Sequence, residues 1–148
     1  MTAYNPLTDS MGFLLGQTFR RVSYLTNLRF RSHDITAEQW ILLLCLKERG
    51  SITQTELAEA SGKDKTTVTR LLDNLERKGM VTKCADEADR RARLIDVTPK
   101  GRRTAEELVD VEKQVLDIAM SGLAPDEVAQ LRALLVRIQR NVKAETDM

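Results

Sequence analysis

The sequence of 148 residues contains little of several residue types that particular protein classes require. Aromatic residues make up 4%, and there are 7 glycines, 3 prolines, 2 cysteines and 1 histidine. Two cysteines cannot supply the disulfide framework of a small secreted domain. One histidine, two distant cysteines and no glycine-rich phosphate loop offer little for a metal site or a catalytic nucleophile. We therefore expect no metal, no cofactor and no enzyme activity, and the scarcity of glycine and proline favours helix.

Long apolar segments are also missing. The longest strongly apolar run, residues 40–46, is far shorter than the roughly 20 residues that a membrane-spanning helix needs. Residues 1–10 lack the basic segment that leads into the apolar core of a secretory signal. These absences predict a cytoplasmic protein that does not associate with membranes. The length of 148 residues predicts one domain, or one compact module with helical extensions.

Charge is plentiful but unevenly distributed. The chain has 23 Lys and Arg against 22 Asp and Glu, a net charge of +1. Residues 62–103 carry 12 basic and 7 acidic side chains, whereas residues 104–148 carry 5 and 9. A local basic surface attracts the DNA backbone, because each neutralised phosphate releases condensed counterions. Overall neutrality is therefore compatible with a nucleic-acid-binding surface in the middle of the chain.

Two helices are predicted before residue 51. Apolar residues recur at helical spacing from Leu15 to Leu25, which indicates a helix over about 10–31. The segment from Thr36 to Gln39 has the pattern of a capping box, and it opens a second helix that ends at Gly50. This second helix is apolar nearly all round, so we expect it to lie at the centre of the fold.

A pair of short helices follows. Thr53 to Glu56 is a second capping-box pattern, and Ser61-Gly62 ends the helix that it starts. Asp64 caps the next helix, and Gly79 closes it. Its apolar positions Val68, Leu71, Leu72 and Leu75 form one stripe. Two short helices joined by a glycine-containing turn are typical of a helix-turn-helix.

A β-hairpin is predicted next. Residues 80–84 and 93–97 are β-prone runs separated by a polar, turn-like segment. The tip places Asp89 among Arg90, Arg91 and Arg93, where the acid either orients a neighbouring arginine for a DNA groove or forms an ordinary exposed ion pair. A two-stranded wing after a helix-turn-helix predicts a winged DNA-binding domain.

Two long helices complete the chain. Thr98 and Pro99 begin one helix that ends at Gly122, and Pro125 begins the last. Their apolar stripes, together with that of the first helix, exceed what a small winged domain covers, so we expect them to pack against a second copy. The predicted fold is mainly α with a small β-hairpin wing. Residues 1–34 and 102–148 form the predicted dimerisation region around a winged helix-turn-helix at 35–101.

The sequence resembles the MarR family of bacterial transcriptional regulators. The matching segments are ITAEQWILL at 35–43, TQTELAEASGKDKTTVTRLLDNLERKGMV at 53–81 and DRRARLIDVTPKG at 89–101. The last resembles the wing signature of the family at Asp89, Arg91, Thr98 and Gly101. The resemblance implies a homodimer that binds a pseudo-palindromic operator, in most cases as a repressor, and that is released by a small phenolic or other lipophilic effector. Two-fold symmetry independently requires half-sites related by a dyad and spaced by whole turns, roughly 10 base pairs or a multiple.

The predicted DNA contacts lie around the helix-turn-helix and in the wing. Lysine and threonine suit phosphates and base edges, arginine can bind guanine through two hydrogen bonds, and helix N-termini favour phosphate. The residues are Thr53, Gln54, Lys63, Lys65, Thr66, Thr67, Thr69, Arg70, Asp89, Arg90, Arg91 and Arg93.

Candidate effector contacts lie along the first two helices. Arg20, Tyr24, His33 and Trp40 are the residues that could line a cleft there. Trp40 has a core position as its alternative, which its apolar neighbours favour, and His33 has the alternative of a polar linker residue.

Two further functions stay open at this point. A redox-sensing regulator of the same fold would use Cys84, which stands beside Lys83, and the alternative is a structural strand cysteine. A protein-interaction module would use the acidic C-terminal helix in place of DNA. A steep dependence of binding on salt favours DNA.

Overall fold

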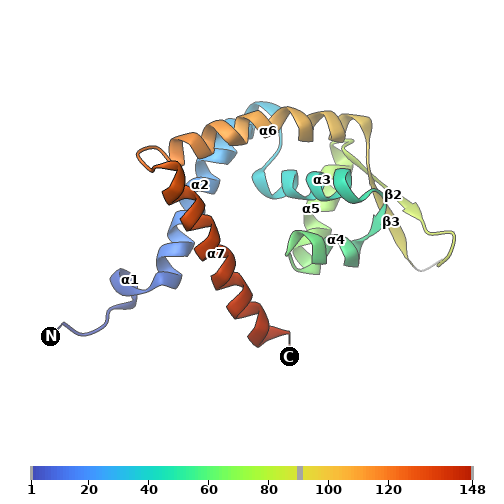
Figure 1. Cartoon of the computed structure of the whole chain (residues 1–148). Helices are drawn as coiled ribbons and strands as arrows, with labels where there is room; N and C mark the ends of the chain where they lie inside the picture. Colours follow the sequence, from blue (N-terminus) through green and yellow to red (C-terminus); the bar gives the residue numbers. More distant parts are fainter. Residues whose placement is uncertain (1, 90–91, 148) are drawn as a thin grey trace. The chain divides into compact units, whose positions relative to one another are not determined.

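A computed structural model describes residues 2–89 and 92–147 (Figure 1). The chain forms two compact units, Met1–Val115 and Leu116–Met148. The first contains the helix-turn-helix and the wing, and the second contains the end of α6 and the whole of α7. No helix in the described part of the chain is long and apolar enough to cross a membrane.

The first unit begins with helices α1, Pro6–Asp9, and α2, Met11–Phe30. Ser10 caps α2, because its hydroxyl accepts a hydrogen bond from the amide of Phe13. The predicted helix over 10–31 is confirmed, with a 3-10 turn, η1 at Arg31–His33, at its end. Helix α1 was not predicted, since a single turn is too short to show apolar periodicity.

Helix α3, Ala37–Arg49, begins with the predicted capping box. The Thr36 hydroxyl accepts from the Gln39 amide at 3.2 Å, and the Gln39 carbonyl oxygen Oε1 accepts from the Thr36 amide at 3.1 Å. Trp40, Leu42, Leu43 and Leu46 are buried, which confirms the central position expected for this helix.

The helix-turn-helix consists of α4, Gln54–Ser61, and α5, Lys65–Arg77. Val68, Leu71, Leu72 and Leu75 are buried, as the apolar stripe predicts. The second capping box is only half formed. The Thr53 hydroxyl accepts from the Glu56 amide, but the Glu56 carboxylate accepts from that hydroxyl and not from the Thr53 backbone.

The sheet has three antiparallel strands in the order β1-β3-β2 (Figure 1). The predicted hairpin corresponds to β2, Val81–Ala85, and β3, Arg93–Val97, which pair from Val81 with Val97 to Ala85 with Arg93. The third strand, β1 at Ile52–Thr53, pairs with Ile95 and Leu94 of β3. The two-strand prediction missed it, because two residues are too few to show strand alternation.

Helix α6, Pro99–Ala119, begins where β3 ends. The Thr98 hydroxyl accepts from the Gly101 amide at 3.1 Å and donates to the Gly79 carbonyl at 2.7 Å, so the predicted cap also joins the helix to the start of the wing. A Cβ atom on Gly101 would lie 2.2 Å from the Met80 carbonyl oxygen. This close approach of two backbones requires glycine.

In the second unit, helix α7, Pro125–Thr146, follows the turn after α6. None of its described residues is buried. Leu131, Leu134, Ile138 and Val142 are all exposed, although they follow helical spacing. The apolar stripe predicted for this helix is therefore present and uncovered within a single chain.

Candidate nucleic-acid interface

The start of α5 is organised by Asp64. Its carboxylate accepts hydrogen bonds from the Thr67 amide at 2.8 Å and from the Thr67 hydroxyl at 3.0 Å. These hydrogen bonds lower the pKa of Asp64, so an anion stands at the positive end of the helix. Thr67, a predicted DNA contact, is half-buried and its hydroxyl serves the cap.

Thr69 and Gln54 join the two helices of the helix-turn-helix. The Thr69 hydroxyl donates to the Lys65 carbonyl at 2.9 Å and accepts from the Gln54 side-chain amide. Both partners were predicted to contact DNA. Their hydrogen bonds hold α4 against α5. Helix α5 is the second helix of the helix-turn-helix, the one called the recognition helix in this motif, and these bonds fix its position.

Arg70 extends from the exposed face of α5. Its side chain is 62% exposed, and Nη2 lies 3.6 Å from Oε2 of Glu38 in α3. Such an exposed pair contributes little to stability, about 0–1 kcal/mol, and it leaves the guanidinium able to exchange partners. Lys65 and Thr66 are likewise exposed at the beginning of the helix.

A shallow hollow follows this face of α5. It is lined by Thr66, Thr69, Arg70, Asp73, Asn74 and Arg77. The last three were not predicted as part of the surface. Spacings of three, four and seven residues from Arg70 would have found them, because side chains at those spacings share a helix face.

The wing carries Asp89 and Arg93. The amide of Asp86 donates to the Ala92 carbonyl and the amide of Ala92 donates to the Asp89 carbonyl, both at 3.1 Å, and Arg93 begins β3 with an exposed side chain. Arg90 and Arg91, the other two predicted wing contacts, lie outside the described residues.

The two remaining predicted contacts flank α4. Thr53 caps its N-terminus, and Lys63 follows its C-terminus with a half-buried side chain. The Lys63 amide donates to the Ala58 carbonyl at 3.2 Å, which closes the turn of the helix-turn-helix.

The four candidate effector residues occupy different environments. Trp40 is 5% exposed, donates its indole N–H to the Ala105 carbonyl at 3.0 Å and packs edge-on against Phe30, so it takes its alternative role in the core. Nε2 of His33 lies 3.9 Å from a Glu107 carboxylate oxygen. Arg20 and Tyr24 are exposed on α2.

A hollow of about 290 Å³ lies beside the link between α2 and α3. None of the four candidate effector residues lines it. Its lining residues are Asn27, Arg31, Asp34, Ile35, Thr36 and Lys78.

The cysteines do not support a redox switch. The redox alternative relied on Lys83 beside Cys84, but the Lys83 ammonium group lies 2.8 Å from an Asp73 carboxylate oxygen, and neighbouring strand residues point to opposite faces. Burial raises the pKa of the Cys45 thiol, which lowers its reactive thiolate fraction. Within the described residues, no three His, Cys, Asp or Glu side chains are grouped to hold a metal ion.

Comparison with known proteins gives the same picture. Residues 35–92 match the model of the MarR family. The HTH-type transcriptional regulator YybA of Bacillus subtilis is 28% identical over 88% of this chain and 87% of its own. The structure also resembles two solved proteins of this kind. For BpsR of Bordetella bronchiseptica, whose DNA binding is regulated by 6-hydroxynicotinic acid, the TM-score is 0.85 at 26% identity, covering 93% of this chain and 98% of that one. For a mutant of MarR from E. coli complexed with operator DNA, the TM-score is 0.84 at 28% identity, covering 93% of this chain and 99% of that one.

The matched segment contains α3, the helix-turn-helix and the first strand of the wing, β2, and it ends directly before β3. The solved structures extend the likeness over nearly the whole chain. Family members are transcriptional regulators and not enzymes, as expected from the composition. The chain therefore carries a MarR-type winged helix-turn-helix domain at residues 35–92, shares its fold with solved regulators of that family, and is a DNA-binding transcriptional regulator.

Proposed function

We propose that this regulator is a repressor that binds a pseudo-palindromic operator as a homodimer and is released by a small lipophilic or phenolic effector. The observation that carries the proposal is the exposed face of α5, where Lys65, Thr66 and Arg70 stand clear of the core. Lysine and threonine suit phosphate contacts, and arginine suits guanine. As a binder of chromosomal DNA, the protein would act in the cytoplasm.

Uncovered apolar surface supports the homodimer. Helix α2 exposes Met11, Leu14 and Phe19, the last with 67% of its surface. In the second unit, α7 has no buried residue among those described, and an apolar groove of about 730 Å³ runs between the end of α6 and α7. Apolar patches of this extent mark interfaces in water-exposed proteins. A second copy would cover them, with residues 1–34 and 102–148 as the dimerisation region and residues 35–101 as the DNA-binding domain.

The proposed DNA contacts divide by what their side chains already bind. Lys65, Thr66, Arg70 and Arg93 are exposed and suited to direct contact. Arg90 and Arg91, which lie outside the described residues, are proposed as contacts from the sequence alone. Thr67 and Thr69 have hydroxyls engaged in hydrogen bonds within the protein, as has the amide of Gln54. We assign these three to positioning the recognition helix.

The effector site is proposed along α2. Arg20 and Tyr24 are separated by four residues and share a face of that helix, where a cation and a phenol suit an aromatic anion. We include His33, which is half-buried just after α2, as a third polar residue of the proposed effector site. Trp40 is not included, because it lies in the core. Because the described chain leaves this face of α2 open, a partner copy would complete the cleft.

Selection of duplexes from a random DNA library tests the DNA-binding part of the proposal. The retained sequences should contain two half-sites related by a dyad. Their affinity should fall steeply with salt, with a slope in log units of about −0.9 for each neutralised phosphate. Arg70→Ala should cost about 1–3 kcal/mol at the selected operator if the guanidinium binds a base.

The matched control is Arg29→Ala, which removes an exposed arginine from α2. It should leave operator affinity within about twofold, since it changes net charge without touching α5. Equal losses in the two variants would place the base contact elsewhere. A monomer by light scattering at micromolar concentration would refute the homodimer.

Repression and release need a separate measurement. A reporter gene behind the selected operator should be silenced by the protein, and 6-hydroxynicotinic acid, the compound that acts on BpsR, is the first probe for release. Replacing Arg20 with Ala should weaken release by an anionic effector without changing operator affinity. Activation of the reporter by the protein would overturn the repressor assignment.

A further inference from the structure

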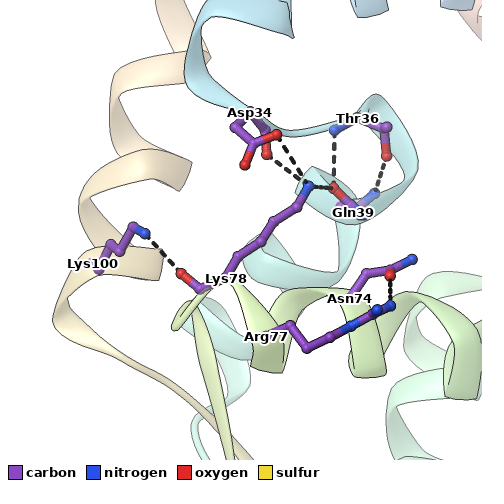
Figure 2. Close-up of polar contacts among 7 residues, drawn as sticks. All are labelled: Asp34, Thr36, Gln39, Asn74, Arg77, Lys78 and Lys100. Atoms are coloured by element: carbon purple, nitrogen blue, oxygen red, sulfur yellow. Dashed lines mark hydrogen bonds and ion pairs between the residues drawn. The ribbon is translucent and has the colours of Figure 1, made fainter.

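Lys78, the residue that follows α5, has an ammonium group that turns back into the protein (Figure 2). Its Nζ donates to the Asp34 carbonyl at 2.7 Å and to Oε1 of Gln39 at 3.1 Å, and it lies 3.8 Å from the Asp34 carboxylate. The side chain is 24% exposed. A lysine that follows the recognition helix is thus bound to two residues near the start of α3, 39 or more positions away in sequence.

The acceptors are held rigidly. Gln39 is 4% exposed, and its Oε1 also accepts from the Thr36 amide in the α3 capping box. Asp34 has a left-handed backbone with a φ of 53°, fixed by the hydrogen bond from its amide to the Arg31 carbonyl. Two fixed acceptors take two of the three N–H donors of the ammonium group, and the Asp34 carboxylate adds an ion pair at 3.8 Å. The geometry therefore defines where the end of α5 can lie.

The same cluster reaches two further helices. Oδ1 of Asn27 in α2 accepts from the Ala37 amide at 2.7 Å, in the first turn of α3. Nζ of Lys100 in α6 donates to the Lys78 carbonyl at 2.7 Å (Figure 2). Lys78 thus stands between the recognition helix and α2, α3 and α6. The neighbouring contact of Arg77 with Asn74 stays within α5.

We propose that Lys78 is a positioning residue for operator recognition. It does not contact DNA. Its hydrogen bonds to Asp34 and Gln39 fix α5 relative to the start of α3 and to α2. This inference rests on the proposed homodimer, in which α2 belongs to the dimerisation region. Through Lys78, the dimer then sets the separation of its two recognition helices, and thereby the half-site spacing that the protein selects.

Lys78→Met tests the proposal, because it keeps the aliphatic stem and removes the donor. The readout is the dissociation constant for the selected operator with one base pair inserted between its half-sites, divided by the dissociation constant for the selected operator itself. Loss of a charged hydrogen bond should reduce this ratio roughly tenfold. A fall in the folded fraction scales both constants equally, so it leaves the ratio unchanged.

Lys47→Met is the matched control. Its Nζ lies 3.4 Å from a Glu106 carboxylate oxygen and its side chain is 34% exposed, so this variant loses the same charge and a contact between α3 and α6 without affecting α5. It should retain the wild-type ratio. Gln39→Met removes an acceptor of Lys78 without changing charge, and it should reduce the ratio as Lys78→Met does. In this ratio the double variant should be no worse than Lys78→Met alone, since Lys78→Met already removes the Lys78–Gln39 contact that the two variants share.

The outcomes separate this inference from the proposed function. A wild-type protein that prefers the native spacing, with Lys78→Met and Gln39→Met keeping that preference, overturns the role of Lys78 alone. Wild-type binding that is equally tight for both spacings and for a single half-site overturns the homodimeric operator complex, and the inference with it. If Lys78→Met does not fold, the ratio measured for Gln39→Met supports or overturns the role of Lys78 by itself.

Discussion

Nζ of Lys83 in β2 lies 2.8 Å from Oδ1 of Asp73 in α5. Lys83 is 18% exposed, so its ammonium group is held in this contact. The hydrogen bond and the charge of Lys83 lower the pKa of Asp73. The wing and the recognition helix are therefore joined directly by a pair of side chains, in addition to the apolar core beneath them.

We predict that Asp73→Asn is less stable than the wild-type protein at neutral pH, and that this difference disappears in acid. The sign follows from the lowered pKa of Asp73. A lowered folded-state pKa stabilises the fold above the ordinary aspartate pKa, and this stabilisation is lost as the pH falls through the lowered value.

Urea unfolding of both proteins at a series of pH values measures this difference. Lys83→Met should show the same convergence, since it removes the other half of the pair. A difference in the free energy of unfolding that stays constant into acid would mean that the carboxylate charge is not what Asp73 contributes.

Gly101→Ala is predicted to be strongly destabilised, by about 3 kcal/mol or more, because the added Cβ would overlap the Met80 carbonyl oxygen. Gly62→Ala is the control. Gly62 has a positive φ of 71° and open space around it, so alanine there should cost only about 1 kcal/mol. Thermal or urea unfolding measures both. Equal losses of stability in the two variants would show that the backbone around Gly101 and Met80 can shift to accommodate a Cβ atom at little cost.

Trp40→Phe is predicted to lower stability by about 1–3 kcal/mol, because the indole hydrogen bond to the Ala105 carbonyl and part of the buried ring volume are lost. Operator affinity and release by an effector should stay close to wild type, since the indole lies in the core and not in a cleft. Titrating the protein–operator complex with an effector checks this. Selective loss of release, with stability intact, would return Trp40 to the effector site.

Cys84→Ser is predicted to bind the operator as the wild type does, both before and after peroxide. Lys83 faces Asp73, so the structure gives Cys84 no activating cation on that side. Gel-shift titrations with and without peroxide make the comparison. Peroxide that releases the wild-type protein but not Cys84→Ser would establish the redox alternative.

The predictions that held were those whose signals lie within a few residues. The capping box at Thr36, the cap at Asp64 and the start of α6 at Thr98 are local hydrogen-bond patterns, and all three form. The apolar stripe of α5 is equally local, since helical spacing alone puts its members on one face. The family resemblance rested on the same segments.

The sequence could not show the partners of side chains that have several possible hydrogen bonds. Thr67 and Thr69 stay predicted DNA contacts, and the structure adds that Asp64, Lys65 and Gln54 bind their hydroxyls within the protein. Strand β1 could not be predicted, because its two residues become a strand only beside β3. A partner that lies 15 or more residues away leaves no mark on local periodicity.

The sequence by itself determined the longer helices, the two wing strands and the basic character of residues 62–103, because caps, apolar spacing and charge act over a few residues. Only the tertiary structure decided which of the polar side chains stay available to DNA. Contacts such as Lys78 with Gln39 and Trp40 with Ala105 join residues 39 and 65 positions apart. Such partners are chosen when the core brings distant helices together, and the choice fixes how the recognition helix is held.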